Sequence, residues 1–350
     1  MDATAPSNAD LAELLSRKAE ESSGILVRAF RRAARSAFGW PERAADLVAE
    51  GRALTELHGV GPFIAEELLG WIENPSATTH RPPPIRRDFL TRADAGVILS
   101  RNKEWAARLR GDLQMHTEWS DGTGKIAEMA QAAAERKYEY IGITDHSKGL
   151  KIAGGIDEKA LARQGKEIAK VNAAVRHTGV TVLRSIEMNL NPRGEGDMDD
   201  AALARLDIVL GAFHSALRTK EDQTNRYLAA VRNPDIQILG HPRGRIYNFR
   251  MGLKADWARV FAQAARLDKA VEIDSYPDRQ DLNVGLLKIA RKEGVRISLG
   301  TDSHHPHQLD FIELGLAAAL KARIPPERVL NFMDLADLRA WVAKLRLRRR

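Results

Sequence analysis

Tyr140-Ile-Gly-Ile-Thr-Asp-His-Ser147 is a short apolar run that ends in a cluster of polar side chains. Two other stretches have the same pattern, Asp112-Leu-Gln-Met-His116 and Arg296-Ile-Ser-Leu-Gly-Thr-Asp-Ser-His304. Short apolar runs bounded by polar or turn-forming residues are typical of buried β-strands. We therefore expect strands whose C-terminal ends carry functional side chains.

Seven such runs alternate with helical patterns along the larger, C-terminal part of the chain. The expected strands cover residues 112–115, 140–143, 181–186, 208–213, 236–239, 270–273 and 296–299. Helical patterns occupy residues 126–136, 158–177, 223–231, 256–267 and 284–293. Strands that alternate with helices form parallel β/α units, and this many units favour a closed barrel over an open sheet.

Histidines and acidic residues follow most of these strand ends. A parallel barrel collects the C-terminal ends of its strands at one mouth, so we expect these side chains to meet. Imidazole and carboxylate groups suit Zn²⁺, Mn²⁺ or Fe²⁺. The other five of the ten histidines do not end a strand, and we interpret them as structural. The residues that follow strands are His116, Asp121, Asp145, His146, Glu187, His214, His241, Asp302 and His304.

The composition excludes several classes of protein. The chain has 350 residues, of which 44% are hydrophobic and 29% charged, and this is not the composition of a collagen, a coiled coil or a disordered protein. It has no cysteine, which excludes disulfides, thiolate zinc sites, Fe–S clusters and a cysteine nucleophile. No targeting or membrane segment is visible, so we expect a cytoplasmic protein.

Residues 1–75 are expected to form a small helical domain. Gly59-Val60-Gly61, followed by a helix from Pro62, resembles a helix-hairpin-helix motif. In such a motif the glycines allow a DNA phosphate to approach the backbone, and amides at the start of the second helix donate to it. A tight connection between two packed helices would need the same residues, and both interpretations stay open.

The net charge of +7 is unevenly distributed. Residues 1–75 carry eight basic and twelve acidic groups, whereas residues 76–110 carry eight and three. We interpret residues 76–108 as a Pro-rich basic linker, residues 109–343 as the barrel, and residues 344–350 as a basic tail. If DNA binds, the linker, the tail or the helical domain should contact it, although the tail could equally be a solvated end.

The strand-end motifs resemble the PHP (polymerase and histidinol phosphatase) superfamily of metal-dependent phosphoesterases over about residues 109–340. Together with Ser120-Asp-Gly122, His241-Pro-Arg-Gly-Arg245 and Ser275-Tyr-Pro-Asp-Arg-Gln-Asp-Leu-Asn283, they are most similar to the C-terminal PHP domain of bacterial family X DNA polymerases. The resemblance implies an α/β fold, a distorted (β/α)7 TIM-like barrel, with up to three divalent metal ions. No polymerase palm fits between residues 74 and 108, so polymerase activity is not expected.

The resemblance also implies three ligand sets. These are His116, Glu187 and Asp302; Glu187, His214 and His241; and Asp121, His146 and His304. Gln114 stands where many members have a histidine ligand. Glu187 and His214 would act directly in catalysis, and Asp145 would orient a ligand.

Basic residues near the same strand ends could hold phosphate oxygens. Arg243, Arg245 and Arg279 are suited to bidentate contacts, and Lys148 and Lys151 are further candidates. Ordinary solvated loop cations would give the same sequence.

These features favour a metal-dependent phosphoesterase that uses a metal-activated water on nucleic-acid phosphates, as a 3′–5′ exonuclease or a 3′-end-processing enzyme. The cofactors would be Mn²⁺ or Zn²⁺, or Fe²⁺. Two other hypotheses stay open, because a fold does not dictate a function. The first is a small-molecule phosphatase of the histidinol-phosphate type, and the second is a DNA-binding module without catalysis.

Overall fold

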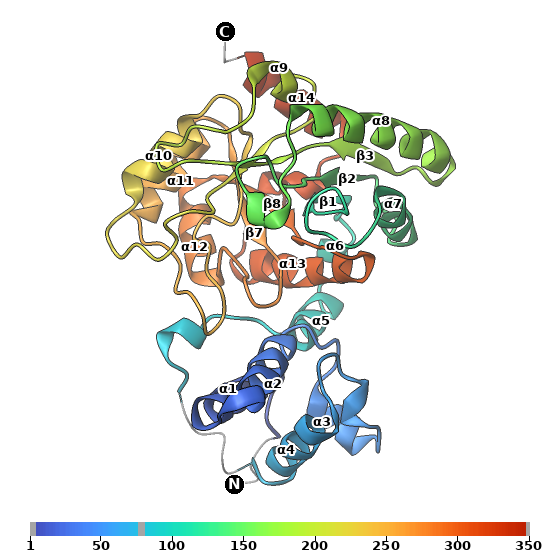
Figure 1. Ribbon diagram of the computed structural model, residues 1–350, viewed down its shortest axis with the longest axis vertical. Helices are drawn as coiled ribbons and strands as arrows, with labels where there is room; N and C mark the ends of the chain where they lie inside the picture. The colour runs from blue at the N-terminus through green and yellow to red at the C-terminus, as the bar shows by residue number, and fades with distance from the viewer. Residues whose placement is uncertain (1–4, 76–80, 348–350) are drawn as a thin grey trace.

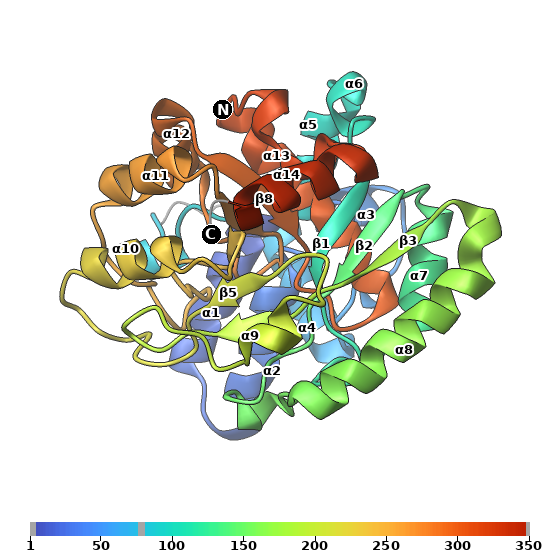
Figure 2. The same ribbon diagram turned by 90° about the horizontal axis from the view of Figure 1, so that it is seen from above.

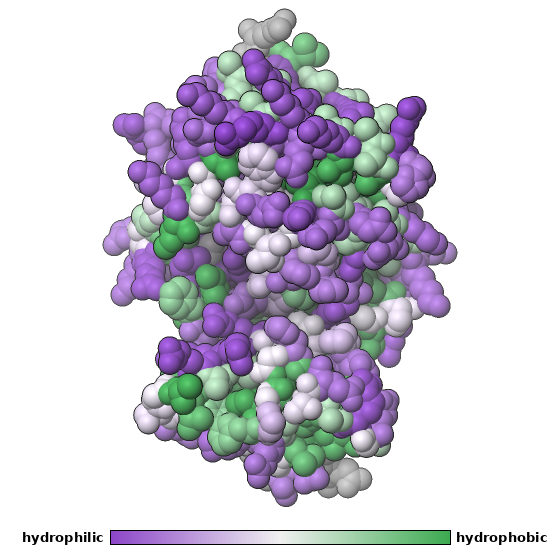
Figure 3. Space-filling model, turned by 45° about the vertical axis from the view of Figure 1, so that its right-hand side comes forward, coloured by the Kyte–Doolittle hydropathy of each residue, from purple (hydrophilic) through white to green (hydrophobic). Residues whose placement is uncertain are grey.

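The computed structural model describes residues 5–75 and 81–347. A helical region lies at one end of the long axis, and a larger α/β region occupies the rest (Figure 1). Polar side chains cover most of the α/β region on the face drawn in Figure 3, whereas the helical region shows a larger apolar share. No described helix is long and apolar enough to cross a membrane.

The helical region comprises α1 (Asn8–Glu21), α2 (Gly24–Ser36), α3 (Ala44–Ala49), η1 (Leu54–Glu56) and α4 (Pro62–Glu73). Ser7 and Asp10 form a capping box that starts α1, which satisfies amides that the first turn would leave unpaired. Phe30, Trp40 and Leu68 are among the buried side chains that make up its core.

The turn from Gly59 to Gly61 is positioned by packing. Gly59 has a φ of 79°, and a Cβ there would lie 2.6 Å from Ser36 Oγ, so the position favours glycine on both counts. Val60 is buried in the helical core, and Gly61 caps α4 with Pro62 in its first turn. The structure therefore gives each residue of the turn a role in joining helices, and DNA contact remains a proposal.

The segment expected to be a linker is largely structured. After η3 (Pro84–Arg86) it forms α5 (Arg92–Ser100) and α6 (Lys103–Ala106), and α5 packs against α13 (Ile312–Lys321). Ala95 and Leu99 are buried in the core of the α/β region. The proline run suggested an extended spacer, but the apolar residues after it are spaced to cover the α/β region instead.

The α/β region contains every expected strand. β1 (Gly111–Met115), β2 (Tyr140–Ile143) and β3 (Thr181–Arg184) form one parallel sheet. The second parallel sheet comprises β4 (Glu187–Asn189), β5 (Leu210–Ala212), β6 (Ile238–Leu239), β7 (Ala270–Asp274) and β8 (Arg296–Gly300). The single strand expected at 181–186 is wrong in its C-terminal bound. β3 ends at Arg184, and after Ser185 and Ile186 the chain enters the second sheet as β4. Parallel bridges from Met115 to Ser303 and from His146 to Glu187 connect the two sheets.

Helices surround the strands (Figure 2). They are α7 (Ile126–Glu135), α8 (Glu158–Val175), α9 (Asp200–Leu203), α10 (Thr224–Arg232), α11 (Trp257–Arg266), α12 (Val284–Glu293), α13 and α14 (Leu335–Leu347), with η4 (Lys151–Ala153), η5 (Arg176–Thr178), η6 (Pro306–Phe311), η7 (Pro326–Arg328) and η8 (Leu330–Phe332). The expected basic tail begins inside α14: Lys344 lies 3.3 Å from Asp268, and Arg346 donates to the Leu206 carbonyl. Residues 348–350 lie outside the described residues.

The helical region is fastened to loops that follow β6 and β7. Tyr247, in the loop after β6, is buried in the helical core, where its hydroxyl lies 3.0 Å from Ser16 Oγ. Asp278, in the loop after β7, lies 4.0 Å from Arg35. Because these loops leave the C-terminal ends of parallel strands, the helical region packs at the end of the sheets where site residues were expected.

Lys269, just before β7, gives a prediction about pH. Its side chain is buried and its ammonium donates to the Asn233 carbonyl; burial lowers its pKa to about 8. An unfolded lysine has a pKa near 10.4. Between the folded and the unfolded pKa of Lys269, the unfolded chain therefore binds more protons than the folded chain. The free energy of unfolding rises with pH in this range, by up to about 1.4 kcal/mol per pH unit. Lys269→Met should remove this rise in urea titrations between pH 8 and 10. Parallel pH profiles for the two proteins would contradict it.

Candidate metal centre

The ends of the parallel strands bring the predicted histidines and acids together. His116 follows β1, His146 lies three residues beyond β2, and Glu187 begins β4. Further members follow the remaining strands, with His214 after β5, His241 after β6, and Asp302 and His304 after β8. Strand direction therefore gathers residues that are far apart in the sequence, as expected for parallel β/α units.

Glu187 lies at the centre of this cluster and is fully buried. Its Oε1 lies 2.5 Å from His241 Nε2 and 3.0 Å from His214 Nε2. Its Oε2 lies 3.2 Å from His146 Nδ1 and 3.3 Å from His116 Nε2. One carboxylate thus faces four imidazoles, two on each oxygen.

Among the described residues, three overlapping groups of side chains have donor atoms close enough to share a metal ion. They are His116, Glu187 and Asp302; His116, Asp121, His146 and His304; and His146, Glu187 and His214. The first is the expected set, and the second is an expected set with His116 added. In the third group, His146 takes the place that was expected for His241. His241 does not belong to this group, but it contacts the same Glu187 oxygen as His214 does.

The donor atoms fit a divalent metal ion. Both ring nitrogens of His116 and Nδ1 of His146 are buried without a hydrogen-bond partner among the described atoms. Buried polar atoms are costly unless something satisfies them, and imidazole with carboxylate is a donor set for Zn²⁺, Mn²⁺ or Fe²⁺. The residues present therefore fit the metals that the sequence motifs implied.

The charges of the cluster are strongly coupled. Burial opposes ionisation of Glu187, but the surrounding imidazoles hold its pKa well below the usual range. Burial also opposes a proton on His241, yet Glu187 raises its pKa to about 9. The Glu187 carboxylate therefore favours a proton on His241, and a metal ion held by His241 would compete with that proton.

Asp145 has a supporting position. Its carboxylate accepts hydrogen bonds from the Thr117 amide at 2.8 Å and hydroxyl at 2.7 Å, from Ser120 Oγ at 2.5 Å and from Gln164 Nε2 at 2.6 Å. It belongs to none of the three groups found in the described part of the chain. These contacts fix the loop that carries Asp121, in keeping with an orienting role.

The contacts of Gln114 lead to a residue that sequence analysis missed. With its amide nitrogen directed toward Glu272, Gln114 lies 2.6 and 3.0 Å from the two oxygens of that carboxyl group. Burial raises the pKa of Glu272 well above its usual range. The missed signal was the alternation in Ala270-Val-Glu-Ile-Asp274, which places two acids on one face of an otherwise apolar strand.

The predicted phosphate-binding cations lie in different places. The Arg279 guanidinium contacts the Asp302 carboxylate, so it lies at the metal centre. Lys148 pairs with Glu158 at 2.6 Å, and Lys151 is exposed. Arg245 is a correction: it is buried over the Phe89 ring, and its Nε and Nη2 donate to backbone carbonyls, so it joins segments of the fold.

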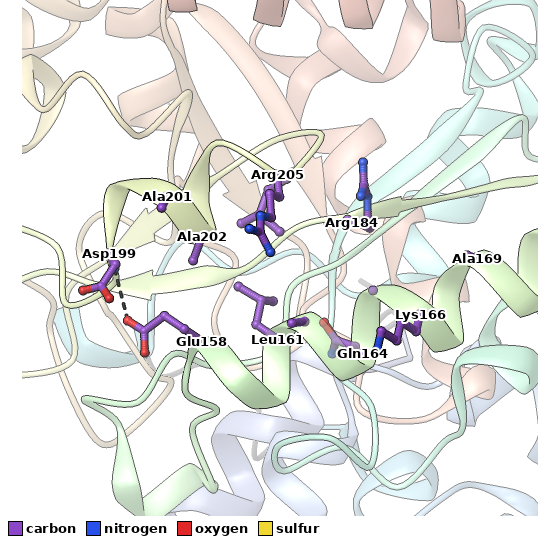
Figure 4. A pocket seen from close by; sticks show the side chains of 13 residues that line it. Glu158, Leu161, Gln164, Lys166, Ala169, Arg184, Asp199, Ala201, Ala202 and Arg205 are labelled. Carbon is purple, nitrogen blue, oxygen red and sulfur yellow. Dashed lines mark hydrogen bonds between the residues drawn. The ribbon is translucent and has the colours of Figure 1, made fainter.

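A different hollow illustrates why shape alone does not find the site. About 470 Å³ in volume, it lies along α8 and α9 and is lined by Glu158, Lys166, Arg184, Asp199 and Arg205 among others (Figure 4). None of the three metal-binding groups lines it. Its relation to the centre is indirect, through Gln164, which lines the hollow and donates to Asp145.

The model of the PHP domain family matches residues 112–301, more than half of the chain. The chain belongs to this family. It is 36% identical over 267 residues to the DNA polymerase/3'-5' exonuclease PolX of Bacillus subtilis, covering 75% of this chain but only 46% of that protein. A "Probable phosphatase" of Caldicellulosiruptor bescii is 27% identical, with 63% of this chain and 89% of that protein covered.

A solved structure of histidinol phosphate phosphatase from Lactococcus lactis is 17% identical, with a TM-score of 0.47, and covers 62% of this chain and 94% of that one. The family match and the relatives in sequence support a phosphate-ester hydrolase.

Proposed function

We propose that this protein is a metal-dependent phosphoesterase that hydrolyses nucleic-acid phosphate esters, by 3′–5′ exonuclease or 3′-end-processing action. The observation that carries the proposal is the position of Glu187, whose two oxygens each face two imidazoles. A carboxylate shared in this way suits a site that holds two metals close together, as phosphoryl hydrolysis requires. Mn²⁺, Zn²⁺ and Fe²⁺ all suit these ligands.

Divalent metals would supply activation of a water and of the phosphoryl oxygens. The side chains of this protein supply the rest. Arg279, beside Asp302, is placed to donate to a phosphoryl oxygen. His214 is oriented by Asn189, whose Oδ1 lies 3.1 Å from His214 Nδ1, so its Nε2 faces Glu187. Burial lowers the pKa of His214, which favours the neutral imidazole that ligation needs.

Two features support a nucleic acid as the substrate. The Bacillus subtilis relative is described as a 3'-5' exonuclease as well as a polymerase. The helical region, which we propose to be a helix-hairpin-helix domain, is fastened to loops at the same end of the strands as the metal centre. We further propose that the two sheets form a distorted (β/α)7-type barrel, with β3 and β4 acting as one interrupted strand.

A small-molecule phosphatase is the second candidate. It is favoured by the relatives described as probable phosphatases, one of which matches 63% of this chain over 89% of its own length. A small phosphate monoester would need only the metal centre and Arg279. A third candidate, a DNA-binding module without catalysis, requires that the purified protein bind no metal.

The proposal predicts Mn²⁺-dependent release of nucleotides from a single-stranded 3′ end. His214→Ala should lower this rate at least about 100-fold, because even changes around metal ligands cost 10- to 100-fold in metal affinity or activity. His177→Ala, at an exposed position after α8, is the matched control and should be unchanged. No nucleotide release from protein shown by elemental analysis to be loaded with metal would overturn the proposal, and hydrolysis of histidinol phosphate alone would favour the second candidate.

A further inference from the structure

Four arginines line one hollow between the α/β region and the segment before α5. The hollow has a volume of about 210 Å³, and we call it the arginine pocket. Arg87 comes from the segment after η3, whereas the other three come from the loop after β6. Its arginines are Arg87, Arg243, Arg245 and Arg250.

Within residues 5–75 and 81–347, none of these four guanidinium groups forms an ion pair with a carboxylate. Their hydrogen bonds go to backbone carbonyls instead: Arg243 Nη2 donates to Met251 at 2.7 Å, and Arg87 and Arg250 donate to Pro82 and Gly244. In addition, Arg243 Nε is buried without a hydrogen-bond partner among the described atoms.

Such a pocket has unsatisfied positive charge. Asp88 lines it, but only its backbone carbonyl accepts from Arg245, and Asp281 accepts from the backbone amide of Arg243. Burial, followed by the charges of Arg279 and Arg218, lowers the pKa of Arg250, as expected where cations gather. An anion with several acceptor oxygens would satisfy the free donors and offset the repulsion between like charges.

The pocket is joined to the metal centre by short connections. Arg243 is two residues after His241, so their Cα atoms lie within about 7.6 Å of each other. Arg245 Nε donates to the Arg279 carbonyl at 2.7 Å, and the Arg279 side chain contacts Asp302. The pocket and the metal centre therefore share the loops that follow β6 and β7.

An exposed aromatic residue directly precedes Arg250 of the arginine pocket in the sequence. Phe249 is 56% exposed, and the Arg218 guanidinium lies 4.7 Å from its ring centre. The loop that carries it is closed by a bridge between Ile246 and Arg250 and anchored through buried Tyr247. Cations that follow a phosphate backbone, combined with an aromatic ring on which a base can stack, are what single-stranded nucleic acid requires.

We propose that the arginine pocket and Phe249 form a binding subsite for a single-stranded nucleic acid, next to the nucleotide cleaved at the metal centre. The pocket holds a backbone phosphate, and Phe249 stacks on a neighbouring base. The subsite rests on the proposed function for its substrate class, but its affinity for a strand requires no bound metal.

The test is fluorescence anisotropy of a labelled oligothymidylate with full-length, EDTA-treated protein. Phe249→Ala should weaken binding about 5- to 150-fold, the range that base stacking covers, while Phe249→Trp retains it. Arg250→Gln and Arg87→Gln should each weaken binding and lower the slope of log K against log salt by about 0.7. Arg163→Gln, at an exposed position on α8, is the control and should leave binding unchanged.

Two further measurements separate the sources of phosphate and the two proposals. Metal-loaded Phe249→Ala should hydrolyse bis(p-nitrophenyl) phosphate within about twofold of the unmodified protein, because that ester does not reach the ring. The strand subsite is overturned if inorganic phosphate or thymidine monophosphate binds as tightly as the oligonucleotide. It is also overturned if Phe249→Ala binds the oligonucleotide as tightly as the unmodified protein does. Tight, Phe249-dependent binding without hydrolysis would overturn the proposed activity and leave the subsite standing.

Discussion

Glu187→Gln is expected to empty the metal centre and lower hydrolysis by more than about 100-fold. Glutamine has nearly the same shape, but it lacks the negative charge that faces four imidazoles at this fully buried position. Two of the three metal-binding groups use Glu187, so both lose an anionic ligand in one step. Elemental analysis after dialysis and the rate on a single-stranded 3′ end measure the two effects.

Glu272→Gln is the matched control. Glu272 is equally buried and accepts the His241 amide at 2.7 Å, but burial raises its pKa, so a neutral side chain already suits that position. We expect metal content and rate to fall less than tenfold. Equal losses in the two variants would show that burial, and not the charge at the centre of the cluster, decides metal binding.

Arg86→Met is expected to destabilise the helical region by about 3–5 kcal/mol. The Arg86 and Glu13 side chains are only 5% and 9% exposed, and Arg86 Nε lies 2.8 Å from Glu13 Oε2. Removing the arginine leaves a buried carboxylate without its partner, which costs far more than the pair contributes. Urea titration, with hydrogen exchange at α1 to localise the loss, measures this change in the free energy of unfolding.

Arg52 provides the comparison, because it also contacts several carboxylates. It lies 2.7 Å from Glu42 and 2.7 Å from Glu56, but its side chain is 37% exposed. Arg52→Met should therefore leave the free energy of unfolding nearly unchanged, because exposed ion pairs contribute little. The double variant Glu13→Gln/Arg86→Met should recover much of the loss. A similar cost for Arg52 and Arg86, or no recovery, would contradict the desolvation argument.

The strands and most of the metal centre could be predicted because a parallel β/α fold converts sequence position into spatial position. A histidine directly after an apolar run, such as His116 or His214, lies at the C-terminal end of a parallel strand, where such ends lie side by side. Glu272 could not be found by this rule, since it lies within a strand and points to the inside. Sequence analysis did not predict the two helices after the proline run, because the spacing of their apolar residues is explained only by packing against α13.

The arginines predicted from the sequence to hold phosphate show what a sequence can and cannot reveal. Arg243, Arg245 and Arg279 are alike in the sequence, each a basic residue after a strand. In the structure the Arg279 side chain contacts Asp302. Arg245 donates to backbone carbonyls and lies over the Phe89 ring. Arg243 lines the arginine pocket together with Arg87. A long flexible side chain can reach several partners, so its partner depends on the segments that the fold places beside it.

The sequence by itself determined the class of fold, the absence of thiol chemistry and the set of imidazoles and carboxylates at the strand ends. These follow from residue type and from the period of the apolar pattern, which are local properties. Only the tertiary structure decided which imidazoles face Glu187, that the helical region is fastened to loops at one end of the sheets, and that four arginines line one pocket without an ion pair to a carboxylate of the described residues. Those features depend on distances between segments far apart in the chain, and local pattern carries no information about them.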